Sequence, residues 1–361
     1  MPGRTLLDRL ESLCNVDVDD ASTDFIKSLQ PFTPHNQTSN QAIITGELLK
    51  PTNEGLLKDL VKQYGSKGWD EVYDRAAVQI CARNVPLISG RVLIQTSLRY
   101  ANDRDAIIRQ CRSYAAAFAD AGVPRDRFAI KLPFSGAAAS AALVLNAEGI
   151  RTLATAVFSL EQAIAASQSN CLFISPYYNE IAAHLDPSLR LVFADPALEN
   201  PMSARVVHIL ETYAKAYAAT GKEQPIMVIA SHFNTAEVLA MAELGCQHVT
   251  ISAANLVALR ETPDSLPPVT RPKPKHPYAE LATPERLRVL STVDPLAGPD
   301  WNGVLATMDT DYVADGGAKL DEFLRTDPVA GRRLRDATQF FLQAEDKARQ
   351  AIEKQIAAAG L

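Results

Sequence analysis

The sequence predicts an α/β protein of the (β/α)8 TIM barrel class, followed by a C-terminal helical extension. Short apolar, β-branched runs alternate with longer segments of helical character along most of the chain. Eight such runs can be counted, and several of them end in a polar residue. A doubly wound open sheet is the alternative fold. No Gly-x-Gly-x-x-Gly motif follows any early run, so that alternative lacks its usual dinucleotide-binding signal.

The eight predicted strands are four to six residues long and rich in Val, Ile, Leu and Thr. In chain order they are Val16–Asp19, Ala42–Thr45, Val92–Thr96, Phe128–Leu132, Thr152–Val157, Cys171–Ser175, Ile226–Ala230 and His248–Ser252. The segments between them have helical character, namely Glu54–Tyr64, Arg104–Ala121, Ala137–Glu148, Leu160–Ser167, Ser203–Thr220 and Thr235–Leu244. This alternation predicts parallel strands joined by helices.

The predicted division is a catalytic barrel over 1–260, a proline-rich connection over 261–280 and a mostly helical extension over 281–361 that packs on the barrel. Prolines recur from Pro263 to Pro277, which indicates an extended surface connection. The segment Arg333–Ala359 is amphipathic and rich in charge. It either caps the barrel or mediates contacts in a homo-oligomer, and its spacing does not decide between the two.

Composition excludes several classes of partner. The chain has 361 residues, 47% of them hydrophobic, and a formal net charge of −6 without a dense basic stretch, which argues against nucleic acid. Arg271, Lys273 and Lys275 lie among prolines and are interpreted as part of a solvated loop. No apolar run approaches membrane-spanning length, and Met1–Leu7 lacks the core of a signal peptide. We therefore expect a cytoplasmic protein without a membrane partner.

Cysteine and histidine usage indicates neither a disulfide framework nor a metal site. The five cysteines are scattered without Cys-x-x-Cys spacing, which fits a reducing cytosol. The six histidines include no His-Glu-x-x-His motif. The sequence thus predicts an enzyme with no metal and no cofactor.

Polar residues at five predicted strand ends are candidate functional groups, because the carboxyl ends of barrel strands meet at one mouth. They are Asp19, Gln95, Lys131, Thr155 and Ser175. Lys131 is the most informative, since it lies in the apolar run Arg127–Leu132. Burial lowers the pKa of an amine and yields the neutral nucleophile that forms an imine with a carbonyl substrate. The alternative is a lysine just past the strand that extends its amine to water.

Five sequence blocks, in order, resemble the transaldolase family of Schiff-base barrel enzymes over most of residues 15–260. Thr38–Ala42 resembles its TTNPS block, and Ile130–Leu132 resembles its imine-lysine strand. Thr155–Ser159 resembles the strand that follows. Ile174–Tyr177 resembles its ISPF block and Ala230–Asn234 its ASFRN block. From Gln95 to Glu180 the family's internal spacing holds without gaps.

The resemblance implies a role for each matched residue. Lys131 would form the imine, and Asp19 would handle protons on substrate hydroxyls, although Asp17 and Asp20 are close enough for this assignment to slip. Thr155 would hold the catalytic water. Three further positions would bind substrate, namely Asn40, Ser175 and Ser231. Such a set suits aldol cleavage, in which a protonated imine accepts electrons while a positioned group moves a hydroxyl proton.

Two departures resemble the fructose-6-phosphate aldolase branch of the family. The family's third-strand glutamate is here Gln95, which orients a proton but cannot exchange one at neutral pH. The phenylalanine of ISPF is here Tyr177, whose phenol can assist proton transfer. That branch pairs a glutamine with a tyrosine around the catalytic water and releases or accepts a free small ketone.

Two other departures predict a poor acceptor phosphate site. The arginine four residues after the ISPF proline is here Glu180, and the arginine of ASFRN is replaced by Phe233 or His232, depending on the alignment. Arginine suits phosphate because its planar fork binds two oxygens at once. Arg205 and Arg99 are the candidates to compensate.

The leading hypothesis is a class I aldolase that uses a small hydroxyketone donor such as dihydroxyacetone, with Tyr177, Gln95 and Thr155 governing the proton steps. A true transaldolase of the pentose phosphate pathway, moving dihydroxyacetone between phosphosugars, is the nearest alternative. A catalytically silent barrel that acts as a binding or regulatory protein is the alternative from another class.

Overall fold

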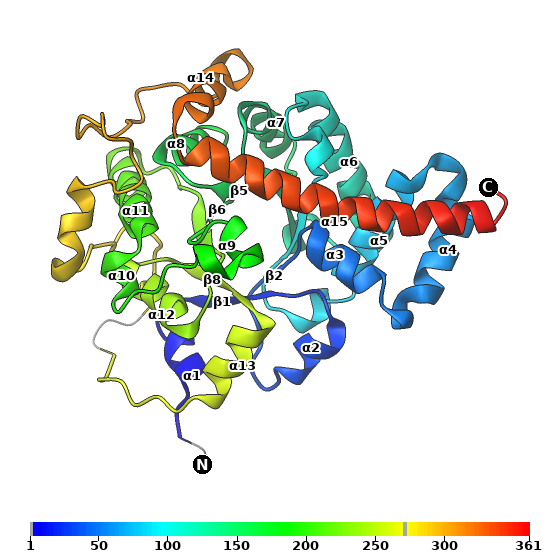
Figure 1. The fold of residues 1–361 in the computed structure, drawn as a ribbon, viewed down its shortest axis with the longest axis horizontal. Coiled ribbons are helices and arrows are strands. Elements are labelled where there is room, and N and C mark those ends of the chain that lie inside the picture. Colours follow the sequence, from blue (N-terminus) through cyan, green and yellow to red (C-terminus); the bar gives the residue numbers. More distant parts are fainter. Residues whose placement is uncertain (1–2, 270–272) are drawn as a thin grey trace.

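The computed structural model describes residues 3–269 and 273–361, so Arg271 lies outside the described residues. Eight parallel strands form a closed barrel in chain order (Figure 1). The strands are β1 (Asn15–Asp19), β2 (Gln37–Thr38), β3 (Val92–Gln95), β4 (Phe128–Pro133), β5 (Thr152–Val157), β6 (Phe173–Pro176), β7 (Ile226–Ile229) and β8 (His248–Ser252). The predicted (β/α)8 fold is confirmed.

Helices connect the strands and cover the outside of the barrel (Figure 1). They are α1 (Leu6–Glu11), α2 (Thr23–Ser28), α3 (Gln41–Leu48), α4 (Glu54–Tyr64), α5 (Trp69–Ala82), α6 (Arg104–Asp120), α7 (Gly136–Ala147), α8 (Leu160–Gln168), α9 (Ala182–Leu185), α10 (Pro196–Glu199), α11 (Pro201–Thr220), α12 (Thr235–Leu244) and α13 (Ala253–Glu261). Several begin directly after a strand at a side-chain cap. Ser135, Ser159 and Asn234 cap α7, α8 and α12 by accepting a bond from a backbone N–H in the first turn.

The prediction of a strand over Ala42–Thr45 is wrong, because these residues lie in α3 and the second strand is Gln37–Thr38. Asn40 caps α3, since its side-chain oxygen accepts a bond of 3.0 Å from the Ile43 N–H. A short apolar run fits the first turn of a helix as well as a strand, so periodicity could not distinguish them. The true strand has two residues, too few to show an alternating pattern.

Alternation along the strands separates an inner core from an outer one. Leu93, Ala129, Leu153, Phe173 and Val228 form a cluster of their own inside the barrel. The residues between them in sequence belong to the larger core that the strands share with the helices. Residues two positions further along β3, β4, β5 and β6 lie nearer the carboxyl ends of these strands. They are Gln95, Lys131, Thr155 and Ser175, four of the predicted site residues.

The N-terminal end of the barrel holds a buried polar network. Asp17 accepts bonds from the Asn36 backbone N–H at 3.0 Å and from its side-chain Nδ2 at 2.9 Å. The same carboxylate lies 3.0 Å from Nδ1 of His248. Lys273, expected in a solvated loop, lies 3.5 Å from the Glu11 carboxylate at this end of the barrel.

The chain after the barrel contains a 3-10 helix (Glu285–Thr292), α14 (Ala314–Thr326) and α15 (Ala330–Ala358). The long helix α15 runs across the strands and packs against β5, α3, α4 and α5 (Figure 1). Among the described residues, no helix combines the length and apolarity needed to cross a membrane.

Close backbone packing and buried polar contacts fix the position of α15. A Cβ added at Gly331 would overlap the carbonyl of Leu324, so α14 and α15 approach each other more closely than a side chain permits. Glu345 is buried, and its carboxylate accepts a bond of 2.9 Å from the Ser97 hydroxyl on the loop after β3. Thr45 of α3 donates to the Ala344 carbonyl at 3.0 Å.

Candidate active site at the barrel mouth

Lys131 lies inside the barrel near the end of β4 and is only 5% exposed. Its Nζ donates to the Thr38 hydroxyl at 2.9 Å and to the Ser39 carbonyl at 3.1 Å. Burial lowers the pKa of Lys131 to about 8, and the nearby Asp19 carboxylate opposes this shift. A substantial fraction of the amine is therefore neutral near neutral pH, the state that attacks a carbonyl carbon.

Asp19 ends β1 beside this lysine. Burial raises the pKa of Asp19 to about 6, and the charge of Lys131 holds it below what burial alone would give. A carboxyl group with such a pKa exchanges a proton close to neutral pH, as a general acid or base must.

The neighbouring Asp17 has a different environment, which bears on the choice between the two aspartates. Both of its oxygens are engaged by Asn36 and His248 at the opposite end of the barrel, and the side chain is fully buried. Asp17 is therefore part of the buried polar network at the N-terminal end of the barrel. Asp19 is the aspartate that shares the mouth with Lys131.

Gln95 lies on β3 in register with Lys131 on β4. Its Nε2 donates to Oε1 of Gln41 at 2.6 Å, and Gln41 in turn donates to the Thr96 carbonyl at 2.8 Å. The Oε1 atom of Gln95 is buried and has no hydrogen-bond partner within the described part of the chain. A buried acceptor left in this state suits a water molecule or a substrate hydroxyl.

Thr155 on β5 and Tyr177 after β6 bring two hydroxyls together. Thr155 Oγ1 donates to Tyr177 Oη at 3.3 Å, and both side chains are buried. The register between β5 and β6 shifts just after Thr155, where Ala156 takes a left-handed conformation with a φ of 53°. Burial raises the pKa of the Tyr177 phenol, so it stays protonated and able to donate.

The three predicted substrate-binding residues differ in what their side chains do. Ser175 is buried on β6, paired in register with Thr155. Asn40 uses its side-chain oxygen to cap α3, and a role of its NH2 group in substrate binding stays a prediction. The Ser231 hydroxyl donates to the Asn179 carbonyl at 2.7 Å and lies 2.8 Å from Nε2 of His184. Its hydroxyl is thus engaged between loops, and a role in substrate binding stays a prediction.

The sequence reading missed two supporting residues. Thr38 contacts the lysine amine and Gln41 orients Gln95. Both belong to the Thr38–Ala42 block, so their place in that block was a usable signal. Thr250 on β8 also places a buried, unpartnered Oγ1 in the described structure, and no motif marked it.

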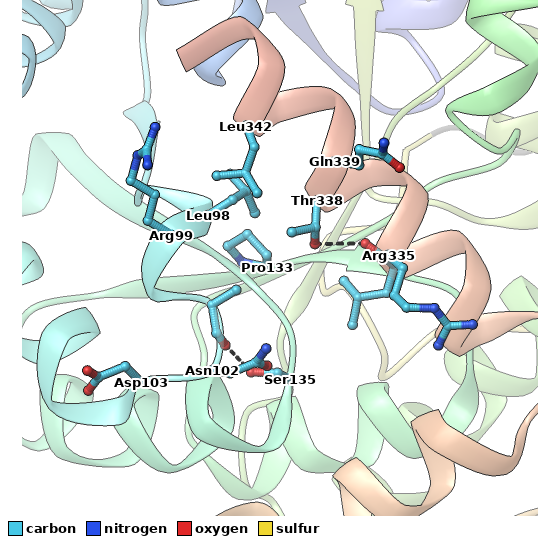
Figure 2. A pocket seen from close by; sticks show the side chains of 12 residues that line it. Leu98, Arg99, Asn102, Asp103, Pro133, Ser135, Arg335, Thr338, Gln339 and Leu342 are labelled. Atoms are coloured by element: carbon cyan, nitrogen blue, oxygen red, sulfur yellow. Dashed lines mark hydrogen bonds between the residues drawn. The ribbon is translucent and has the colours of Figure 1, made fainter. Parts of the chain in front are cut away.

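A cavity of about 450 Å³ lies between α15 and the carboxyl ends of β3 and β4 (Figure 2). Its lining includes Pro133 and Ser135, which follow Lys131 closely along the chain. From the other side, Thr338 and Gln339 of α15 face it (Figure 2). Neither Lys131 nor another predicted site residue lines this cavity, so it lies beside the end of β4 and not at the lysine amine. Within residues 3–269 and 273–361, no group of three His, Cys, Asp or Glu side chains gathers to hold a metal ion.

Comparison with known proteins gives concordant matches. The family model described as Transaldolase/Fructose-6-phosphate aldolase matches residues 16–289. A transaldolase of Rhizobium etli (strain CIAT 652) is 30% identical over 286 residues, covering 78% of this chain and 85% of the relative. A transaldolase of Nostoc punctiforme is 30% identical over 269 residues, covering 72% and 78%. One of Mannheimia succiniciproducens is 27% identical over 269 residues, covering 72% and 81%.

Proposed function

The chain belongs to the transaldolase/fructose-6-phosphate aldolase family and is an enzyme of the class I aldolase or transaldolase type, and from this premise we propose that Lys131 is its imine-forming residue. The donor is a small hydroxyketone such as dihydroxyacetone. The observation that carries the proposal is the buried Lys131 amine, whose pKa is lowered to about 8 beside an aspartate. Every later step of the aldol reaction depends on the imine that this amine forms.

The neutral amine attacks the ketone carbon and water leaves, which gives a protonated imine. That imine accepts the electron pair of the carbon–carbon bond while a base removes the proton of the hydroxyl on the departing carbon. An aldehyde leaves, and protonation of the enamine followed by hydrolysis returns the ketone and the free lysine. Asp19 handles the hydroxyl proton, and Asn40 and Ser175 bind the donor hydroxyls.

Three side chains serve the water-dependent steps in this proposal. Thr155 and Tyr177 share a hydrogen bond, and the free acceptor of Gln95 provides a second anchor for water. Gln95 cannot exchange a proton, so the Tyr177 phenol, which burial keeps protonated, donates the hydrogen bond to the water through which protons pass. The combination of Gln95 with Tyr177 supports release of a free ketone, as in the aldolase branch, over transfer of a three-carbon unit that stays bound to the enzyme.

Two alternatives remain. A true transaldolase of the pentose phosphate pathway would need a phosphate site, and the two positions that resemble the family's arginine positions hold Glu180 and either Phe233 or His232. A silent barrel would have no need for a buried lysine with a lowered pKa.

A cytoplasmic location is supported by five cysteines that are all free and buried.

Intact-protein mass spectrometry after borohydride reduction tests the proposal. The protein is treated with dihydroxyacetone, hydroxyacetone or fructose 6-phosphate, and wild type is compared with Lys131→Met and with the exposed-lysine control Lys58→Met. A reduced adduct in wild type and the control, absent from Lys131→Met, is the expected result. Adducts that persist in Lys131→Met, or no adduct with any donor, would overturn it.

A further inference from the structure

Helix α15 carries an arginine to the region of the proposed site. The Arg333 guanidinium carbon lies 5.9 Å from the centre of the Phe158 ring. That ring meets the Tyr177 ring edge to face, with 5.7 Å between centroids. Arg333 is therefore separated from the proposed proton-transfer tyrosine by one aromatic side chain. It lies outside residues 16–289, the segment that matches the family.

The hydrogen-bonding capacity of Arg333 is largely unused. Its Nε and Nη1 atoms are buried and have no hydrogen-bond partner among the residues that the structure describes. The nearest carboxylate, that of Glu180, lies 3.8 Å from Nε, which is too far for a hydrogen bond. Burial lowers the pKa of Arg333 to about 10, so the group stays charged at neutral pH. A buried charge without hydrogen bonds is costly unless a ligand supplies them.

Other arginines nearby are already engaged. Arg332 contacts Glu180 at 2.6 Å and Asp336 at 3.0 Å. Arg205 pairs with Asp294 at 3.0 Å and donates to the Phe158 carbonyl at 2.7 Å. Arg99 pairs with Glu345 at 3.3 Å. Arg205 and Arg99, the two candidates expected to compensate for the missing phosphate site, therefore have other partners.

We propose that Arg333 is the specificity-determining residue for an anionic acceptor, and that it binds a phosphate or carboxylate group of the aldehyde. The inference rests on the proposed aldol function. An arginine fork presents two adjacent N–H groups to an oxyanion, either from Nε and Nη2 or from Nη1 and Nη2. Arg332 contacts Glu180 at 2.6 Å and so offsets part of the repulsion that the carboxylate at the family's arginine position exerts on an incoming anion. The extension thereby replaces a charge that the barrel lost.

Acceptor kinetics with a fixed donor test this role. With dihydroxyacetone as donor, kcat/KM is measured for glyceraldehyde 3-phosphate, for glyoxylate and for uncharged glyceraldehyde. Arg333→Gln should lower kcat/KM for the preferred anionic aldehyde by about 10- to 100-fold, mainly through KM, and change that for glyceraldehyde by less than about threefold. Phosphate and carboxylate recognition are distinguished by which anionic aldehyde loses most. Arg325→Gln, an arginine of α14 whose side chain is 73% exposed, is the matched control.

Two further measurements separate the possible failures. Inorganic phosphate should inhibit the wild type and inhibit Arg333→Gln less, whereas Arg333→Lys should keep the charge and recover only part of the affinity. An equal loss for charged and uncharged aldehydes would assign Arg333 to holding α15 in place and overturn the proposal, as would no loss for any of them. Borohydride trapping of dihydroxyacetone on Arg333→Gln should match the wild type. If the wild type itself gives no adduct, the aldol function fails rather than the anion site.

Discussion

Thr155 and Tyr177 are joined by a hydrogen bond of 3.3 Å between their hydroxyls, across the adjacent carboxyl ends of β5 and β6. The local backbone explains how they meet, since the register of β5 against β6 shifts at Ala156. A bulge of this kind redirects a side chain next to a site. The pair forms a buried polar unit to which a water molecule can hydrogen-bond.

Replacing Tyr177 with Phe keeps the ring against Phe158 and removes only the hydroxyl. We expect kcat to fall by about 100-fold or more, because a positioned proton-transfer group contributes about 10²–10⁴. The free energy of unfolding should fall by about 1 kcal/mol, the net value of one hydrogen bond. Steady-state kinetics and thermal unfolding measure both quantities.

Tyr178→Phe is the matched control, because the Tyr178 hydroxyl lies 2.6 Å from the Pro196 carbonyl, away from Thr155. This variant should lose stability and keep kcat. Full activity in Tyr177→Phe would show that the phenol takes no part in the chemistry.

The pH dependence of imine formation should report the pKa of Lys131, which burial lowers to about 8. Below that pH the amine is protonated, so the rate should rise about tenfold per pH unit up to pH 8 and then level off. Asp19, whose pKa is raised to about 6, should add a steeper fall below pH 6 in the overall reaction. Borohydride-quenched imine formation with dihydroxyacetone and the steady-state rate of the overall reaction, both measured from pH 5.5 to 9.5, give the two profiles.

The Asp19→Asn variant tests the direction in which the charge of Asp19 shifts the pKa of Lys131. The negative charge of Asp19 raises the pKa of Lys131, so its removal should move the rising limb to lower pH. A limb that moves to higher pH, or a wild-type midpoint near that of an exposed lysine, would contradict the assignment.

Gln95→Glu restores the carboxylate that the family places on the third strand. We expect it to raise the ratio of dihydroxyacetone transferred to dihydroxyacetone released by about 10-fold, because a carboxylate can exchange protons with the site water. The protein should lose about 1–3 kcal/mol, since Gln41 Oε1 would lose the bond that Gln95 Nε2 donates at 2.6 Å.

Product analysis with an added aldehyde acceptor measures that ratio. Gln95→Leu, which offers neither donor nor acceptor, should lower release and transfer together. A ratio that stays the same in Gln95→Glu would mean that this position does not separate the two activities.

Gly331→Ala should displace α15, because the new methyl group would overlap the Leu324 carbonyl. We expect a loss of about 1–3 kcal/mol in the free energy of unfolding, as for other overpacked sites, and a lower kcat. Gly46→Ala in α3 is the control, since nothing lies within 4 Å of a Cβ built there. Differential scanning calorimetry and steady-state kinetics compare the two. Equal free energies of unfolding for both variants would show that the α14–α15 contact accommodates the methyl group without loss of stability.

Pattern along the chain predicted seven of the eight strands and the convergence of their polar ends. The side chains of Gln95, Lys131 and Thr155 lie toward the carboxyl ends of their strands, because each follows by two positions a residue of the cluster inside the barrel. The second strand could not be found in this way. Its two residues lack a period, while the apolar residues after Asn40 imitate a strand at the start of a helix.

The sequence predicts that the extension packs on the barrel, but not where α15 lies on it. An amphipathic pattern over Arg333–Ala359 shows that one face of a helix is buried but not which surface buries it. The burial of Glu345 against Ser97 depends on a contact between positions 248 residues apart, and local sequence carries no sign of it. The Nε and Nη1 atoms of Arg333, which have no hydrogen bond in the described part of the chain, are brought to this place by the same long-range docking.

The separation between the strands that hold Lys131 and the helix that covers them has an evolutionary consequence. Residues 16–289 carry the family likeness, whereas α15 begins at Ala330. Mutations in α15 can therefore change the surface that packs on the barrel without altering the strand that carries Lys131. Relatives that share this lysine but differ in their C-terminal helix would then differ in the aldehyde they prefer while they form the imine in the same way.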